Sequence, residues 1–144
     1  MTATVHAAIG AGLGAFAKDP ATAFVAGVIS HHFADRMPHR EAPISLDVTA
    51  VVGFLVFLRF RYGGASPQLW GALGAIAPDL EHVLARFGIL SKDEKYFTTH
   101  RNKGQLHGNE KVKSDNQVLA AFLGGFLAEA LSRFRGVALC CDEW

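Results

Sequence analysis

Histidine and aspartate recur along this chain at spacings that suit a metal ion. Asp35 follows His31 by four residues and His32 by three, so on a helix its carboxylate falls angularly between the two imidazoles. Asp79 and His82 repeat the pattern at a spacing of three. Imidazole nitrogens and carboxylate oxygens are the ligands that zinc and related divalent metals take in proteins. The two segments therefore predict metal ligands at these five positions.

The alternative explanation for such pairs is structural. A single polar pair at helical spacing is more often hydrogen-bonded within the fold than bound to a metal. Seven histidines in a chain that is 50% hydrophobic shift the balance, because each buried polar group costs about 1 to 3 kcal/mol unless it is satisfied. One metal ion would satisfy several of them. The other four are His6, His39, His100 and His107, and no role is assigned to His39, which follows the predicted helix stop at Pro38.

The composition predicts one domain over residues 1–144, large enough to bury a core without disulfide bonds. The 14 Lys and Arg nearly balance the 13 Asp and Glu, which argues against nucleic-acid binding. Cys140 and Cys141 are adjacent and match neither a zinc-ribbon spacing nor a disulfide framework, so free thiols are expected. The start of the chain lacks the basic region of a signal peptide, and His6 is therefore expected in the mature protein.

Apolar periodicity predicts helices throughout, an all-α fold with no strand. Asp19-Pro20 and Ser66-Pro67 each pair an N-cap with a first-turn proline, whereas Pro78 forces a break. The predicted helices cover about 3–17, 20–35, 45–60, 66–77, 79–88 and 114–135. Residues 89–114 form a polar, basic loop. We therefore expect a compact bundle of about five to six helices that acts as a single metal-binding domain.

The sequence leaves open whether this bundle is membrane-embedded. No uncharged run reaches the 18 to 20 residues of a confident transmembrane helix. In favour of a membrane are three pairs of small residues at i,i+4 spacing, which let helices approach closely in a bilayer. The pairs are Gly10/Gly14, Ala23/Gly27 and Gly71/Ala75. On balance they favour a membrane protein, in which buried His and Asp would mark a functional site.

The motif set resembles a known family. It consists of His6, the run Pro78-Asp79-Leu80-Glu81-His82, and His100-Arg101 leading to His107. It is similar to the inner-membrane metal-dependent hydrolases, small helical proteins with a Pro-Asp-x-Asp-His motif and a later His-Arg…Thr-His-Ser motif. The resemblance, over about residues 1–108, implies metal ligands at His6, Asp79, His82, His100 and His107.

Two departures from the family pattern are present. Glu81 stands where the family has a second aspartate, and the interval from His100 to His107 is longer. The resemblance further implies a distant likeness to helical zinc-dependent phospholipases C. It also implies a location in the inner (cytoplasmic) membrane, or in the cytoplasm if the bundle is soluble.

The leading hypothesis is a metal-dependent hydrolase that acts on a phosphoester or on another small-molecule or lipid-like substrate. A divalent ion, zinc first with manganese or iron as alternatives, would activate a bound water. Asp35 and Asp79 would be ligands or would orient ligands. Glu81 is the candidate general base, and Arg101 could neutralise a substrate phosphate.

Two other functions remain open from the sequence, as does the oligomeric state. One is a non-catalytic membrane protein that binds or transports metal or senses pH. The other is a helical interaction module whose histidines are hydrogen-bonded to the backbone and to caps. A catalytic site differs from a storage site in keeping a coordination position for water.

Overall fold

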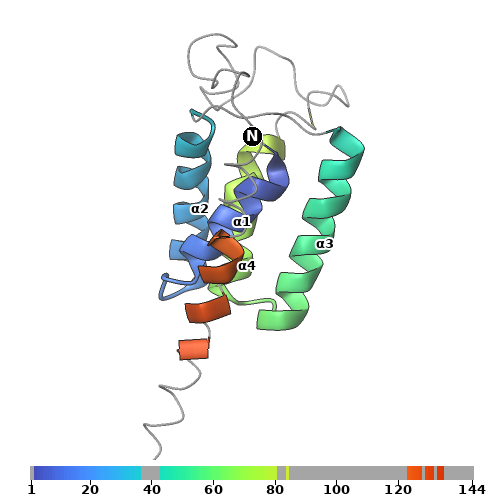
Figure 1. Ribbon diagram of the computed structural model, residues 1–144. Coiled ribbons are helices and arrows are strands. Elements are labelled where there is room, and N and C mark those ends of the chain that lie inside the picture. Colours follow the sequence, from blue (N-terminus) through green and yellow to red (C-terminus); the bar gives the residue numbers. More distant parts are fainter. Residues whose placement is uncertain are drawn as a thin grey trace, which may run out of the picture.

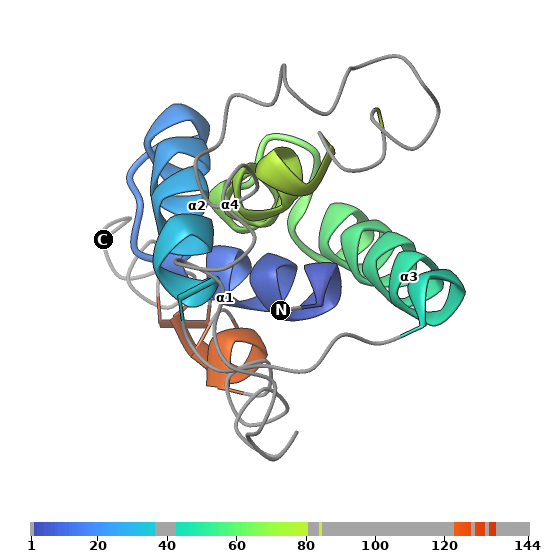
Figure 2. The same cartoon turned by 90° about the horizontal axis from the view of Figure 1, so that it is seen from above.

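The computed structural model describes residues 2–36, 43–80, 84, 123–127, 129–131 and 133–134. Every regular element in these ranges is helical, which confirms the all-α prediction. The elements are α1 (Ala3–Gly14), α2 (Pro20–Ala34), α3 (Ile44–Tyr62), α4 (Pro67–Ile76) and the 3₁₀ helix η1 (Ala77–Asp79). Helical residues between 123 and 134 belong to the predicted last helix. Helices α1 and α4 lie in the middle, with α2 and α3 on opposite sides of them (Figures 1 and 2).

The helix starts follow the local signals in the sequence. Asp19 caps α2, because its carboxylate accepts hydrogen bonds from the backbone N–H of Thr22 at 2.9 Å and from its hydroxyl at 2.7 Å. Ser66 caps α4 in the same way through the N–H of Leu69, at 3.4 Å. In both helices proline occupies the first turn, where its missing N–H costs nothing.

The helix ends agree less closely with the predictions. Helix α1 stops at Gly14, before the predicted end near residue 17, because the last turn tightens through bonds from Phe16 N–H to Leu13 and from Ala17 N–H to Gly14. Helix α3 extends beyond the predicted 45–60 at both ends and stops at Gly63, whose φ of 90° suits glycine. The break predicted at Pro78 is confirmed by η1.

Glycine brings the backbones of α1, α2 and α4 into direct contact. A Cβ atom on Gly10 would meet the backbone oxygen of Gly71 and, at 2.6 Å, the Cβ of Ala75. A Cβ atom on Gly27 would meet the same oxygen of Gly71. Members of all three small-residue pairs thus lie where the three helices touch. Helices α1 and α2, which carry predicted ligands, are thus held in backbone contact with α4, which leads directly into the 3₁₀ helix of Asp79.

The apolar core between α1, α3 and α4 is built from small and medium side chains. Its buried members are Ala7, Ala11, Val51, Leu58, Leu69 and Ala72. None of the described helices combines the length and the apolar character that crossing a membrane requires.

Candidate metal centre

Four of the predicted ligands meet at the end of the bundle where α1 begins and α2 ends (Figure 1). His6 lies on α1, His31 on α2, and Asp35 is the residue that follows the last turn of α2. Asp79 is the last residue of η1. The side chains of His6, His31 and Asp35 are 1 to 3% exposed, whereas that of Asp79 is 27% exposed. Three of the four side chains are therefore buried, and only that of Asp79 is partly exposed.

The two imidazole rings are stacked and share one carboxylate. Their centroids are 4.1 Å apart and their planes differ by 25°. Nε2 of His6 lies 3.1 Å from Oδ1 of Asp35, and Nε2 of His31 lies 3.2 Å from Oδ2. The same nitrogen of His31 is 3.9 Å from Oδ1 of Asp79. These contacts place both rings and both carboxylates around one small volume.

The tautomer of His31 follows from its contact with α4. Nδ1 of His31 lies 2.7 Å from the backbone oxygen of Ala75, and a carbonyl can only accept, so Nδ1 carries the proton. In the neutral ring, the lone pair is then on Nε2, which faces the carboxylates of Asp35 and Asp79. Acceptors that face one another this closely require a cation between them, either a proton or a metal ion.

Burial and charge act differently on the two histidines. Burial lowers the pKa of His6, and the hydrogen bond to Asp35 only partly opposes it. For His31 burial also acts downward, but the hydrogen bond to Asp35 and the charges of Asp79 and Asp35 outweigh it and raise the pKa. Nδ1 of His6 is buried and makes no hydrogen bond to any described residue. Without a metal, the pair therefore favours a proton on His31 over one on His6.

The distances suit a shared divalent ion. Ligand atoms that each lie about 2 Å from a tetrahedral zinc ion are roughly 3.3 Å apart. The 3.2 Å between His31 Nε2 and Asp35 Oδ2 matches this spacing, and the 3.9 Å to Asp79 Oδ1 is close to it. In addition, one ligand atom from each of His6, His31 and Asp79 lies within 4.8 Å of the others.

A fifth residue, which the sequence did not single out, fixes the start of α1. Asp47, in the first turn of α3, accepts hydrogen bonds from the backbone N–H groups of Ala3 and Thr4 at 2.8 and 3.0 Å. The Thr4 hydroxyl donates to the same carboxylate at 2.7 Å. Asp47 thereby caps α1 from another helix and anchors the turn that carries His6. No local pattern marks this role, because the two segments are 44 positions apart.

The structure does not bring His32, also predicted as a metal ligand, into this cluster. Its Nε2 accepts a hydrogen bond from Nη2 of Arg36 at 2.9 Å, away from the cluster. The physical reason is that consecutive helical residues point about 100° apart, and α2 turns the face of His31 toward α4. The other predicted site residues lie outside the described residues: Glu81, His82, His100, Arg101 and His107. So does His39, to which no role was assigned.

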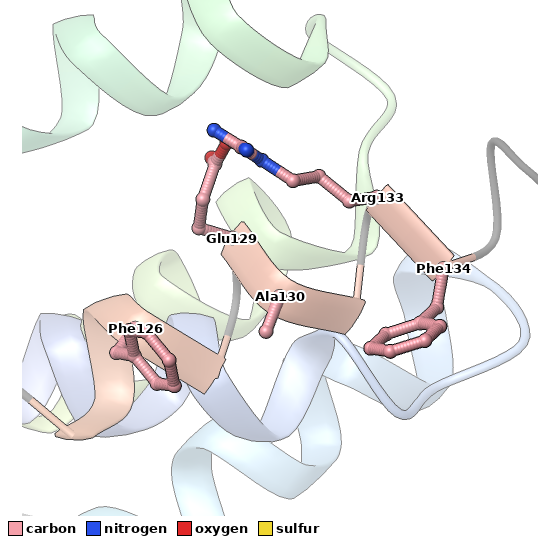
Figure 3. Close-up of a pocket in the computed structure, with 5 residues that line it drawn as sticks. All are labelled: Phe126, Glu129, Ala130, Arg133 and Phe134. Carbon is pink, nitrogen blue, oxygen red and sulfur yellow. The ribbon is translucent and has the colours of Figure 1, made fainter.

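A second polar cluster, also missed from the sequence, surrounds Glu129. Its Oε1 accepts from Nη2 of Arg61 and from Nε of Arg133, both at 2.9 Å, and its Oε2 accepts from the Tyr62 hydroxyl at 2.6 Å. These bonds, Tyr62 first, lower the pKa of Glu129 to about 2. Figure 3 shows the ends of Glu129 and Arg133 close together, with the rings of Phe126 and Phe134 lining the same pocket.

The fold and the buried cluster define a class, a helical bundle with a candidate divalent-metal centre. No protein-family model, curated protein or solved structure matches the chain. The class is thus defined by four residues, His6, His31, Asp35 and Asp79, of which only Asp79 is partly exposed.

Proposed function

We propose that this chain is a metal-dependent hydrolase whose divalent ion, zinc first, is held by His6, His31, Asp35 and Asp79. The proposal rests mainly on one structural observation. Two buried imidazoles, stacked 4.1 Å apart, converge with two carboxylates where α1, the end of α2 and η1 meet. This donor set, two nitrogens and two carboxylates, is one that zinc, manganese and iron accept.

A metal ion explains the contacts better than protons do. Two protonated imidazoles at this distance would repel each other, and the charge of His31 already acts to lower the pKa of His6. A divalent ion would take the lone pairs of both rings and neutralise both carboxylates. The bond from His31 Nδ1 to the Ala75 oxygen, at 2.7 Å, is the bond that the second ring nitrogen of a metal-bound histidine usually makes.

Access beside Asp79 favours catalysis over storage. Catalytic zinc sites keep a position for water, and Asp79, with a side chain that is 27% exposed, is the proposed ligand nearest to solvent. When bound, the metal would supply a water of lowered pKa and would polarise a phosphoryl or acyl oxygen. His6 and His31 hold the site, Asp35 contacts both rings, and Asp79 is the ligand nearest to solvent. The Pro78-Asp79 motif, which resembles that of the hydrolase family, supports a phosphoester or lipid-like substrate, with Glu81 as general base and Arg101 near the phosphate.

Metal binding is tested first, with a matched pair of histidine variants. Purified wild type is expected to retain or take up one or more equivalents of Zn²⁺, measured by elemental analysis and by a thermal shift. His31→Ala should lose this binding. His32→Ala, which removes the adjacent, half-buried histidine that bonds to Arg36, should keep it. Wild type that takes up no Zn²⁺ or Mn²⁺ would exclude a metal centre.

Hydrolysis is tested next on the metal-loaded protein. Phosphomonoesters, phosphodiesters and phospholipids are offered to wild type and to Asp79→Asn, whose folding is checked by circular dichroism. We expect turnover by wild type and at least a hundredfold loss in the variant. Stoichiometric metal without turnover of any ester would instead favour the non-catalytic metal-binding, transport or pH-sensing protein. Activity that survives in Asp79→Asn would mean that the catalytic site lies elsewhere.

A further inference from the structure

Helix α3 has one face packed in the core and another that is exposed. The residues packed against α1 and α4 are Val51, Phe54, Leu55, Leu58 and Tyr62. The exposed face lies within about 60° of Gly53 on a helical wheel and carries no charged residue. Its members, here called the outer face of α3, are Leu46, Thr49, Ala50, Gly53, Val56, Phe57 and Phe60.

Gly53, at the centre of the outer face, differs from the glycines of the other helices. A Cβ atom on any glycine of α1, α2 or α4 would meet the backbone of another helix, whereas one on Gly53 would meet nothing within 4 Å. Glycine weakens a helix relative to alanine, and it is useful where a second backbone approaches closely. The position of Gly53 therefore suits the approach of a further helix.

The outer face repeats at the spacing of a helix pair. Steps of four, three, four and three residues join Leu46, Ala50, Gly53, Phe57 and Phe60. This is the heptad spacing at which two helices pack along their length. Gly53 is also the middle residue of α3, which spans Ile44–Tyr62. The hydroxyl group of the outer face, on Thr49, donates to the backbone oxygen of Ser45 at 2.8 Å and can be covered without losing that bond.

The two halves of the outer face are complementary in size. Thr49 and Ala50, before Gly53, are small, whereas Val56 and Phe57, after it, are large. On the helical wheel, Ala50 and Phe57 lie to one side of Gly53, and Thr49 and Val56 lie to the other. An antiparallel second copy, related by a two-fold axis at Gly53, therefore places Phe57 opposite Ala50 and Val56 opposite Thr49. A parallel copy would instead place the large side chains against each other.

Charge favours the same antiparallel arrangement. Helix α3 has Asp47 in its first turn and Arg59 and Arg61 in its last turn. A parallel copy would bring the arginines of both chains to one end, where they repel. An antiparallel copy brings the arginines of each chain to the acidic end of the other and opposes the two helix dipoles.

The exposed area is sufficient for a dimer. Phe57 and Phe60 are 52 and 84% exposed. With about 150 to 250 Å² for each whole aromatic side chain and smaller areas for the rest, the outer face offers roughly 500 Å² per copy. Two copies would bury about 1,000 Å², the area at which specific interfaces begin.

We propose that the outer face of α3 is a dimer interface, on which α3 of a second copy of this chain packs antiparallel and crosses at Gly53. The interface would cover the second side of the helix whose Asp47 anchors α1. It does not depend on whether a metal binds.

Sedimentation of the 144-residue chain at about 1 to 100 µM tests the interface. Wild type is expected to be a dimer at the upper concentrations. Phe57→Glu places a charge in the outer face and should weaken dimerisation at least about thirtyfold. Ile29→Glu is the matched control, because Ile29 lies on α2 and is 53% exposed, close to the 52% of Phe57. It should dimerise as wild type does.

Disulfide cross-linking tests the orientation. In a Cys140→Ser, Cys141→Ser background, Leu46→Cys and Phe60→Cys chains are mixed and oxidised, and mass spectrometry identifies the products. In the antiparallel pair, position 46 lies level with position 60 of the second copy, whereas the two positions 46 are roughly 21 Å apart along the helices. A disulfide requires Cα atoms within about 7 Å. We expect the mixed disulfide in at least about fivefold excess over either homodimer.

The remaining outcomes overturn the proposal. A wild type that stays monomeric, or a Phe57→Glu variant that dimerises like wild type, would remove the outer face from any self-association. Equal weakening by Ile29→Glu would show that the effect is not specific to this face, and a predominant Leu46→Cys homodimer would exclude antiparallel packing. Circular dichroism of each variant separates loss of the dimer from loss of the fold. The zinc content of the same samples reports on the metal centre separately.

Discussion

Two polar clusters lie at opposite ends of the bundle and differ in the cations that face their carboxylates. Asp35 contacts the imidazoles of His6 and His31, which are cations only when protonated. Glu129 contacts the guanidinium groups of Arg61 and Arg133, which are always charged. The first cluster is buried and the second is at the surface. A carboxylate between guanidiniums already has its charge balanced. Imidazoles beside a carboxylate can instead release a proton and bind a metal ion.

The largest expected effect comes from separating the helices that hold the buried cluster. A Cβ at Gly71 would meet the backbone of Gly10 and Gly14, which cannot move aside as a side chain would. We expect Gly71→Val to lower the free energy of unfolding by about 3 kcal/mol or more and to abolish zinc binding. Urea unfolding and zinc titration measure the two losses.

The control for this change is another helical glycine. A Cβ at Gly53 on α3 would meet nothing within 4 Å. Gly53→Ala should therefore stabilise the protein by about 0.5 to 1 kcal/mol, because alanine favours helix over glycine, and should leave zinc binding unchanged. Equal stability of the two variants would show that α1 and α4 do not meet as described.

The second expected effect separates the two clusters by their response to metal. Zinc at about 100 times its dissociation constant should stabilise wild type by about 2.7 kcal/mol, seen as a rise in Tm of roughly 5 to 10 °C. Glu129→Gln should show the same rise, because its neighbours are guanidiniums and a phenol. Asp35→Asn, with the same shape, should show little of it. A full zinc response in Asp35→Asn would remove Asp35 from the site.

A smaller effect is expected from the cap that reaches α1 from α3. Asp47→Ala removes the acceptor for the N–H groups of Ala3 and Thr4 and should cost about 1 kcal/mol. Because the cap anchors the turn that carries His6, zinc affinity should also fall about tenfold. The matched control is Asp19→Ala, which removes the α2 cap at the other end of the bundle. It should cost similar stability with unchanged zinc affinity, and calorimetric titration compares the two.

The smallest effect concerns the pH dependence of the surface cluster. The pKa of Glu129 is lowered to about 2 from an ordinary value of 4.5. Its contribution to stability is therefore fully present above 4.5 and is lost as the pH falls toward 2, because over that window the unfolded chain binds a proton that the folded chain does not. The difference in urea midpoint between wild type and Glu129→Gln should be constant from pH 7 to about 5 and should shrink below it. A difference that vanishes already near pH 5 would contradict the contacts of Tyr62 and Arg61.

The sequence predicted the helices better than the site. Starts at Asp19-Pro20 and Ser66-Pro67 and the break at Pro78 depend on a few adjacent residues, so they can be recognised locally. The i,i+4 spacing also placed His31 and Asp35 on one face. It could not choose between His31 and His32, because that choice depends on which face of α2 packs on α4.

By itself, then, the sequence determined where helices begin and break, which small residues let them touch, and that histidine and aspartate share a helix face. These properties are set by neighbours along the chain. Only the tertiary structure decided that His6 joins His31 and Asp35, that Asp47 caps α1 and that Glu129 pairs with Arg61. Those contacts join positions tens of residues apart. The first of them forms because backbone contact at Gly10, Gly27 and Gly71 sets how α1, α2 and α4 pack.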